Sequence, residues 1–210
     1  MIDFLIYSGN LILLLNLILY TYSFFRKEKA NIFFVSYLVF AFLMQFSMEL
    51  LYHLKVNNLF VVNIFFIGQM ILLGLFYNSL FYLKGQKLFL KISLLIVLLF
   101  LIVEFVMDSS QFLKFNLFEI TLTSLFIVVF ALIHFYNMLS ETKKYYYVNF
   151  GLIFYFMTST VLFLIGNLSL GLGSDVKYLT WKLNAFLFLV YEFIILYEWK
   201  VSFYKKSISR

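Results

Sequence analysis

Residues 59–83, LFVVNIFFIGQMILLGLFYNSLFYL, form a long run without a charged side chain. The hydrocarbon core of a bilayer is about 30 Å thick, and an α-helix needs about 20 mostly apolar residues to cross it. The strands of a membrane β-barrel would instead alternate apolar and polar side chains over segments of about ten residues. The run is too long and too evenly apolar for such a strand, so it predicts a transmembrane helix.

Six further stretches have the same character and are separated by short polar breaks. They lie near residues 2–24, 31–53, 88–107, 115–139, 146–168 and 178–202. Because the breaks are short, we expect consecutive helices to pack as antiparallel neighbours. The sequence therefore predicts an all-α polytopic membrane protein, with one seven-helix up-and-down bundle over residues 1–210.

The composition of the chain excludes several classes of protein. Hydrophobic residues make up 64% and charged residues 12% of the sequence, against about 45–50% and about 25% in soluble domains. This excludes a water-soluble globule, a disordered chain and a basic nucleic-acid-binding domain. Because cysteine is absent, disulfides, a thiolate nucleophile and cysteine metal sites are excluded as well. The bias toward Phe, Ile, Lys, Asn and Tyr is typical of AT-rich bacterial genomes, so a multi-pass protein of the cell inner membrane is expected.

Basic residues gather on one side of the predicted membrane. The first, third and fifth breaks and the C-terminal tail hold 12 of the 16 Lys and Arg residues, and the other side holds 4. Basic residues favour the cytoplasmic side, so the N-terminus is expected outside and the C-terminus in the cytoplasm. No basic segment precedes the first stretch, which argues against a cleaved signal peptide.

Polar residues at similar depth in the outer leaflet are the first candidate site. Such residues usually face the interior of the bundle or a cavity, and Glu49 and His53 share a helix face because they are four residues apart. If the set converges, it forms an outward-facing acidic pocket suited to a proton, a cation or a cationic ligand. The predicted ligand-binding residues are Glu49, His53, Asn63, Glu104, Glu119 and Asn184. The alternative is that each side chain reaches interfacial water separately. A metal held by the glutamates and His53 is less favoured, and we predict neither a metal nor a cofactor.

A second set of polar residues lies deeper and predicts a polar path or gate. Gln45 and Gln69 match in depth, so their amides could bridge neighbouring helices. Asn16 and Glu192 also match in depth. A protonated Glu192 hydrogen-bonded to Asn16 is one interpretation, and a role of Glu192 in gating, proton transfer or ligand binding is the other.

One face of the fifth span has polar residues at helical spacing through the whole membrane. This face includes Thr123 and His134, which complete the predicted polar path. Asn78 matches His134 in depth, and a buried histidine hydrogen-bonded by an amide is favoured over a proton relay.

Several known intramembrane chemistries do not fit the sequence. A zinc site of three histidines cannot be built because the chain has two. The middle of the last span has no lysine for a retinal Schiff base, and Asp3, Asp108 and Asp175 lie outside the spans where an aspartyl protease would need them. We therefore predict no catalytic residue, although a lipid-active enzyme is not eliminated.

The favoured function is a bacterial receptor or sensor module that signals to a separate cytoplasmic effector or kinase. The alternatives are a transporter or channel for a cation or small amphiphile, and an accessory membrane subunit of a cytoplasmic effector in a stress or defence system. The expected partners are the lipid bilayer and that effector, a homo-oligomer stays an open alternative, and nucleic acid is not expected.

Overall fold

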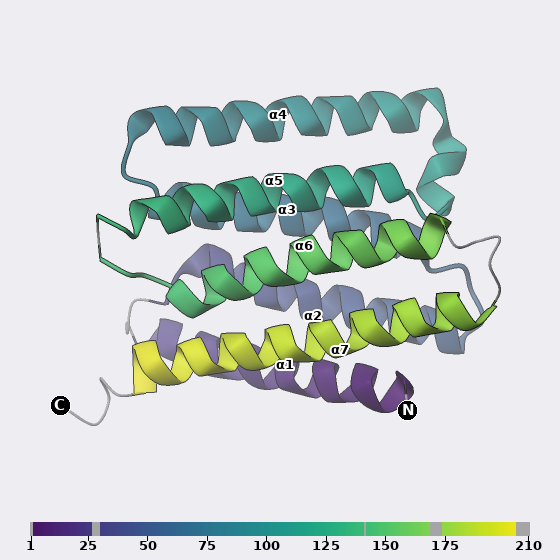
Figure 1. The fold of residues 1–210 in the computed structure, drawn as a ribbon, viewed down its shortest axis with the longest axis horizontal. Helices are drawn as coiled ribbons and strands as arrows, with labels where there is room; N and C mark the ends of the chain where they lie inside the picture. Colours follow the sequence, from purple (N-terminus) through teal and green to yellow (C-terminus); the bar gives the residue numbers. More distant parts are fainter. Residues whose placement is uncertain (1, 27–29, 141, 169–173, 205–210) are drawn as a thin grey trace.

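Seven long α-helices run side by side in the computed structural model, which describes residues 2–26, 30–140, 142–168 and 174–204 (Figure 1). A 3₁₀ turn, η1, joins α4 to α5, and a π-helical segment, η3, continues α7. The elements are α1 (Ile2–Phe25), α2 (Ile32–His53), α3 (Leu59–Leu80), α4 (Lys84–Met107), η1 (Ser109–Leu113), α5 (Leu117–Asn137), α6 (Tyr146–Leu168), α7 (Ser174–Trp199) and η3 (Lys200–Tyr204). The all-helical prediction is confirmed.

The predicted helix boundaries hold to within about one turn. The largest differences are at α4 and α7, which begin at Lys84 and Ser174 rather than near residues 88 and 178. In α4 the polar segment from Lys84 to Lys87 was assigned to a break, but it forms the first helical turn. Lysine is a good helix former, and its long side chain can extend toward water from the end of an apolar helix.

Six helices form a closed ring, and α4 lies outside it. Around the ring, α1 packs on α2, α2 on α3, α3 on α5, α5 on α6, α6 on α7 and α7 on α1. α4 packs on α3 and α5 at the edge of the bundle (top of Figure 1). Consecutive helices therefore pack on each other as expected, and the parallel helices α3 and α5 also contact each other directly.

The bundle has two distinct ends. The N-terminus lies at one end, here called the N-terminal end, together with the α2–α3 and α4–α5 connections (right in Figure 1). The opposite end holds the start of α2, the α3–α4 connection and the end of α7, and we call it the basic end. The predicted excess of Lys and Arg belongs to this second end.

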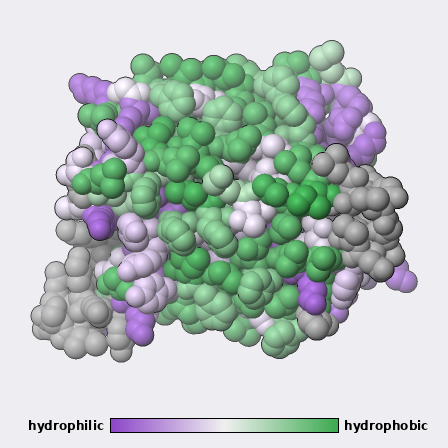
Figure 2. Space-filling view, viewed as in Figure 1, coloured by the Kyte–Doolittle hydropathy of each residue, from purple (hydrophilic) through white to green (hydrophobic). Residues whose placement is uncertain are grey.

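The outer surface is apolar, whereas many polar residues are inside. Figure 2 shows a hydrophobic belt across the helices, with hydrophilic residues toward both ends. The exposed side chains of α4 include Leu95, Ile96 and Leu99. The fully buried polar residues include Asn16, Asn63, Glu119, Thr123 and Asn149. All seven helices are long and apolar enough to cross a membrane, so the architecture is that of a multi-pass membrane protein.

Aromatic rings fill the interior near the basic end. Tyr20, Phe34 and Phe76 are completely buried, and Phe34 contacts both other rings at centroid distances of 5.1 and 5.2 Å. Tyr145, which begins the turn into α6 in a left-handed conformation (φ 55°), packs edge-on against Phe76. Its hydroxyl oxygen accepts a hydrogen bond from the backbone N–H of Asn31 at 2.6 Å. Burial raises the pKa of Tyr145, so this phenol stays neutral and joins the α5–α6 turn to the start of α2.

Candidate functional site

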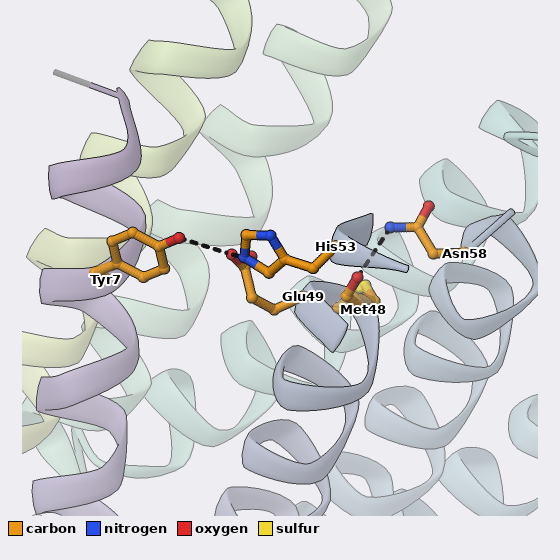
Figure 3. Close-up of polar contacts among 5 residues, drawn as sticks. All are labelled: Tyr7, Met48, Glu49, His53 and Asn58. Atoms are coloured by element: carbon orange, nitrogen blue, oxygen red, sulfur yellow. Dashed lines mark hydrogen bonds and ion pairs between the residues drawn. The ribbon is translucent and has the colours of Figure 1, made fainter. Parts of the chain in front are cut away.

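Glu49 and His53 form a polar contact with α1 at the N-terminal end (Figure 3). The Tyr7 hydroxyl donates to Glu49 Oε1 at 3.0 Å, and His53 Nε2 lies 3.0 Å from the same oxygen. The side chains of Glu49 and His53 are 30% and 61% exposed. Their i, i+4 spacing on α2 creates this pair, as predicted. A protonated His53 makes it an ion pair, so the contact responds to charge while it links α2 to α1.

Glu104 and Glu119 form a second, more buried cluster between α4 and α5. The Asn116 amide donates to Glu104 Oε1 at 2.9 Å, and Asn116 Oδ1 accepts from the backbone N–H of Glu119 at 3.1 Å. Asn116 thus caps α5 and at the same time holds Glu104 of the preceding helix. Glu119 is completely buried, and neither of its carboxylate oxygens has a hydrogen-bond partner among the described residues.

The two clusters do not join into the shared pocket that the sequence predicted. The first bridges α1 and α2, whereas the second lies between α4 and α5, and these helix pairs do not pack on each other. Within the described ranges, no group of three or more His, Cys, Asp or Glu side chains is arranged to hold a metal ion. The less favoured metal site built from both clusters is therefore not formed.

Asn63 and Asn184, the other predicted ligand residues, make structural contacts. The buried Asn63 amide donates to three backbone carbonyls of the α4–α5 connection, those of Gln111, Phe112 and Lys114, at 2.9–3.3 Å. Asn184 Oδ1 accepts from the Ser159 hydroxyl at 2.8 Å and links α7 to α6. Asn63 therefore fastens η1 to α3, beside the Glu104–Glu119 cluster.

The deep pair Asn16 and Glu192 is bonded as one interpretation predicted. The Asn16 amide donates to Glu192 Oε2 at 2.8 Å and to the backbone carbonyl of Glu192 at 2.9 Å. Both residues are buried. One turn further along α1, the Tyr20 hydroxyl donates to the carbonyl of Ile195 at 3.1 Å. These contacts bind α1 to α7 in the half of the bundle nearer the basic end.

The remaining path residues do not form a continuous polar line. The Nε2 atom of Gln69 has no partner in the described part of the chain, so it makes no bridge to Gln45. Thr123 donates to the carbonyl of Glu119 in its own helix at 2.8 Å. His134 Nε2 lies 3.0 Å from the carbonyl of Lys144. Completely buried apolar residues, Ile127, Phe130 and Ala131, separate Thr123 from His134 on α5.

Glu198 is a buried acid that the sequence interpretation missed. It is 2% exposed, its Oε2 accepts from the backbone N–H of Tyr147 at 2.8 Å, and Ser202 also donates to it. Its position seven residues after Tyr191 was the available signal, because that spacing puts both residues on one helix face. Charged and aromatic residues near the end of a span are typical of the membrane interface, so Glu198 was not among the predicted site residues.

The buried tyrosines were also not predicted, because their hydroxyl groups find partners on other helices. The hydroxyls of Tyr37 and Tyr191 lie 3.2 Å apart, and Tyr77 donates to Asn149 Oδ1 at 2.9 Å. Tyr155 stacks on Tyr191 at 4.9 Å. These contacts join α2, α3, α6 and α7, so the centre of the ring is polar at its hydroxyl groups and aromatic elsewhere.

An open apolar groove of about 550 Å³ lies between α4 and α5 at the basic end. Its lining residues are Gly85, Gln86, Phe89, Leu132, Ile133 and Tyr136. Beside it, the side-chain amides of Gln86 and Asn137 exchange two hydrogen bonds, at 3.0 and 2.8 Å. The groove contains none of the predicted ligand residues.

Asp108 accepts several hydrogen bonds in the connection between α4 and α5, and its ionisation should make the stability of this turn depend on pH. Its carboxylate accepts from the Ser110 hydroxyl at 2.7 Å, from the Gln111 amide at 2.8 Å and from the Ser110 N–H at 3.1 Å. These bonds, the Ser110 hydroxyl first, hold the pKa of Asp108 below its ordinary value of 3.8. A carboxylate whose pKa is lowered by folding stabilises the folded turn at pH values above its ordinary pKa. This stabilisation is lost as the pH falls through the lowered pKa.

We therefore expect amide hydrogen exchange at Ser110 and Gln111 to become less protected below about pH 3.8, after correction for the intrinsic rate. The Asp108→Asn variant, which has no carboxylate to titrate, should show the same protection on both sides of that pH. Equal pH responses in the two proteins would contradict the assignment.

Comparison of the chain with protein-family models, with curated proteins and with solved structures gives no match.

Proposed function

We propose that the chain is a membrane-embedded sensor module whose input is the charge state of the Tyr7–Glu49–His53 contact. A proton, a cation or a cationic ligand at this contact changes the bond between α2 and α1. The half-exposed position at the N-terminal end supports this assignment, because the site is reachable from water and still linked to a second helix.

The observation that carries the proposal is that α1 has polar contacts at both of its halves. Tyr7 contacts the Glu49–His53 pair, and Asn16, about 14 Å further along the helix, contacts Glu192 of α7. Trp199, at the end of α7, donates its indole N–H to Ser23 Oγ of α1 at 2.9 Å. A shift of α1 at the N-terminal end is thus transmitted to the end of α7.

The direction of signalling follows from the distribution of charge. In the sequence, 12 of the 16 basic residues fall in the breaks and the tail predicted for one side. Those that the structure describes include Lys84, Lys87, Lys143 and Lys144 at the basic end, and basic residues favour the cytoplasmic side of a membrane. We infer that the Tyr7–Glu49–His53 contact faces outward in the inner membrane, and that the end of α7 meets a separate cytoplasmic effector. A ligand can shift the equilibrium between two conformations of the bundle only if its affinities for the two conformations differ.

A proton is the simplest probe of this sensor, because histidine changes charge between about pH 5 and pH 8. The chain has no cysteine, so Tyr136→Cys and Val201→Cys allow two spin labels at the basic end, on exposed positions of α5 and after α7. Between pH 8 and pH 5 we expect the label distance to change by about 1–2 Å, the size of typical helix shifts.

The change should disappear in His53→Gln, which keeps a polar side chain without the charge, and in Tyr7→Phe, which loses the bond to Glu49. Tyr178→Phe is the matched control, since Tyr178 is also exposed at the N-terminal end, and it should respond like the parent protein. An unchanged distance in the parent, or the same change in His53→Gln, would refute the sensor mechanism. Proton flux through liposomes that is lost in Glu192→Gln would favour a transporter instead.

A further inference from the structure

The unusual feature of the α4–α5 pair is the environment of Glu119. This residue stands in the first turn of α5 and is 0% exposed, and both of its carboxylate oxygens lack a hydrogen-bond partner among the described residues. The N-terminus of a helix favours a negative charge, but this offsets only a small part of the cost of burying a carboxylate. A buried carboxyl group is neutralised by a proton or by a cation, and the described side chains supply no cation for Glu119.

A second carboxylate makes the need greater. Glu104 acts electrostatically on Glu119, and its Oε1 is held by Asn116, whose Oδ1 caps the same turn of α5. The other oxygen of Glu104, Oε2, is buried without a partner. The basic residue nearest in the sequence, Lys114, directs its ammonium to the Ser110 hydroxyl at 2.8 Å. Three buried carboxylate oxygens from two helices thus remain unpaired.

An independent observation comes from α3. Asn63 is completely buried, and its amide nitrogen is committed to the backbone carbonyls of Gln111, Phe112 and Lys114. Its oxygen, Oδ1, is buried and has no partner in the described part of the chain. A neutral amide oxygen beside the same α4–α5 connection therefore also lacks a donor.

We propose that Glu104 and Glu119 bind one small divalent cation of the hard class, such as Ca²⁺ or Mg²⁺, at the N-terminal end. Two carboxylates balance the charge of one such ion, and carboxylate and amide oxygens are its preferred ligands. The ion fastens α4, the helix outside the ring, to α5. This site is separate from the Tyr7–Glu49–His53 contact and does not depend on the sensor function.

The test uses the full chain in zwitterionic nanodiscs, with CaCl₂ or MgCl₂ compared with EDTA. At about a hundredfold excess over the dissociation constant, the ion should raise the unfolding temperature by about 5–10 °C. Glu119→Gln and Glu104→Gln should lose this rise. Asp3→Asn, which removes an exposed carboxylate in the first turn of α1 at the same end, is the matched control and should keep it.

Direct binding protects the test against a folding defect. Electron paramagnetic resonance should show Mn²⁺ bound to the parent and to Asp3→Asn at a temperature where all variants are folded. Binding should fall at least tenfold in Glu119→Gln. The proposal is overturned if the parent shows no metal-dependent rise, or if Glu119→Gln keeps it. It is also overturned if Glu119→Gln has a higher unfolding temperature than the parent and the metal ion does not change the unfolding temperature of the parent. In that case a proton would neutralise the site.

Discussion

Replacing Asn16 with leucine is expected to destabilise the bundle by about 1–3 kcal/mol, the cost of leaving a buried polar group without its partner. The Asn16 amide donates to both the carboxylate and the backbone carbonyl of Glu192. Leucine has a similar branched shape but no donor, so the Glu192 carboxylate would lose the bond from α1 while the Glu192 carbonyl kept only its intrahelical bond. The free energy of unfolding can be measured by titration with sodium dodecyl sulfate in mixed micelles.

The control for this prediction is Glu192→Gln, which keeps an acceptor oxygen for Asn16. We expect this variant to lie within about 1 kcal/mol of the parent, because a glutamine preserves the bond between α1 and α7 without a group that can ionise. In the double variant Asn16→Leu/Glu192→Gln, the leucine should lower the free energy of unfolding by less than it does in the single variant. If Asn16→Leu is as stable as the parent, the Asn16–Glu192 contact does not hold the two helices together.

Gly68→Ala is expected to cost about 1–3 kcal/mol, as overpacking does in other tightly packed interiors. A Cβ atom at position 68 of α3 would lie 2.2 Å from Cζ and 2.6 Å from Cε1 of Phe40 on α2. Glycine in membrane helices allows such close approach of a neighbouring helix. The ring must move or the α2–α3 distance must increase, and the same detergent titration would measure the loss.

Gly85→Ala is the matched control, because a Cβ atom at this position in the first turn of α4 meets nothing within 4 Å. Alanine is up to about 1 kcal/mol better than glycine in a helix, so this variant should be neutral or slightly stabilised. Phe40→Leu should recover part of the loss when it is combined with Gly68→Ala. Equal stability of Gly68→Ala and Gly85→Ala would show that Phe40 turns away at little cost.

The sequence predicted those parts of the candidate sites that depend on one helix or on depth. Glu49 and His53 meet because four residues make one helical turn, which is a local property. Asn16 and Glu192 could be paired because residue counts convert into depth, and a buried carboxyl group at that depth needs a partner. Glu198 was not predicted because aromatic and charged residues near a helix end are typical of the interface. Tyr191 was not predicted because its partner, Tyr37, lies on a different helix.

The lateral order of the helices could not be derived in the same way. A helix that is apolar on every side has no stripe that identifies its neighbour, so nothing in residues 84–107 indicated that α4 lies outside the ring. This arrangement separates Glu49 from Glu119 and divides the expected pocket into two sites. It also places Ile127 and Phe130 between the polar groups of α5, which interrupts the predicted path.

The number of helices, their lengths and their apolar surfaces were already contained in the order of the amino acids, because bilayer thickness and the cost of a charge in hydrocarbon act on each segment separately. The positions at which side chains from different helices meet depended on the assembled bundle. Close packing around residues such as Gly68, and the pairing of buried polar groups across the ring, are properties of several segments together, and no single segment records them.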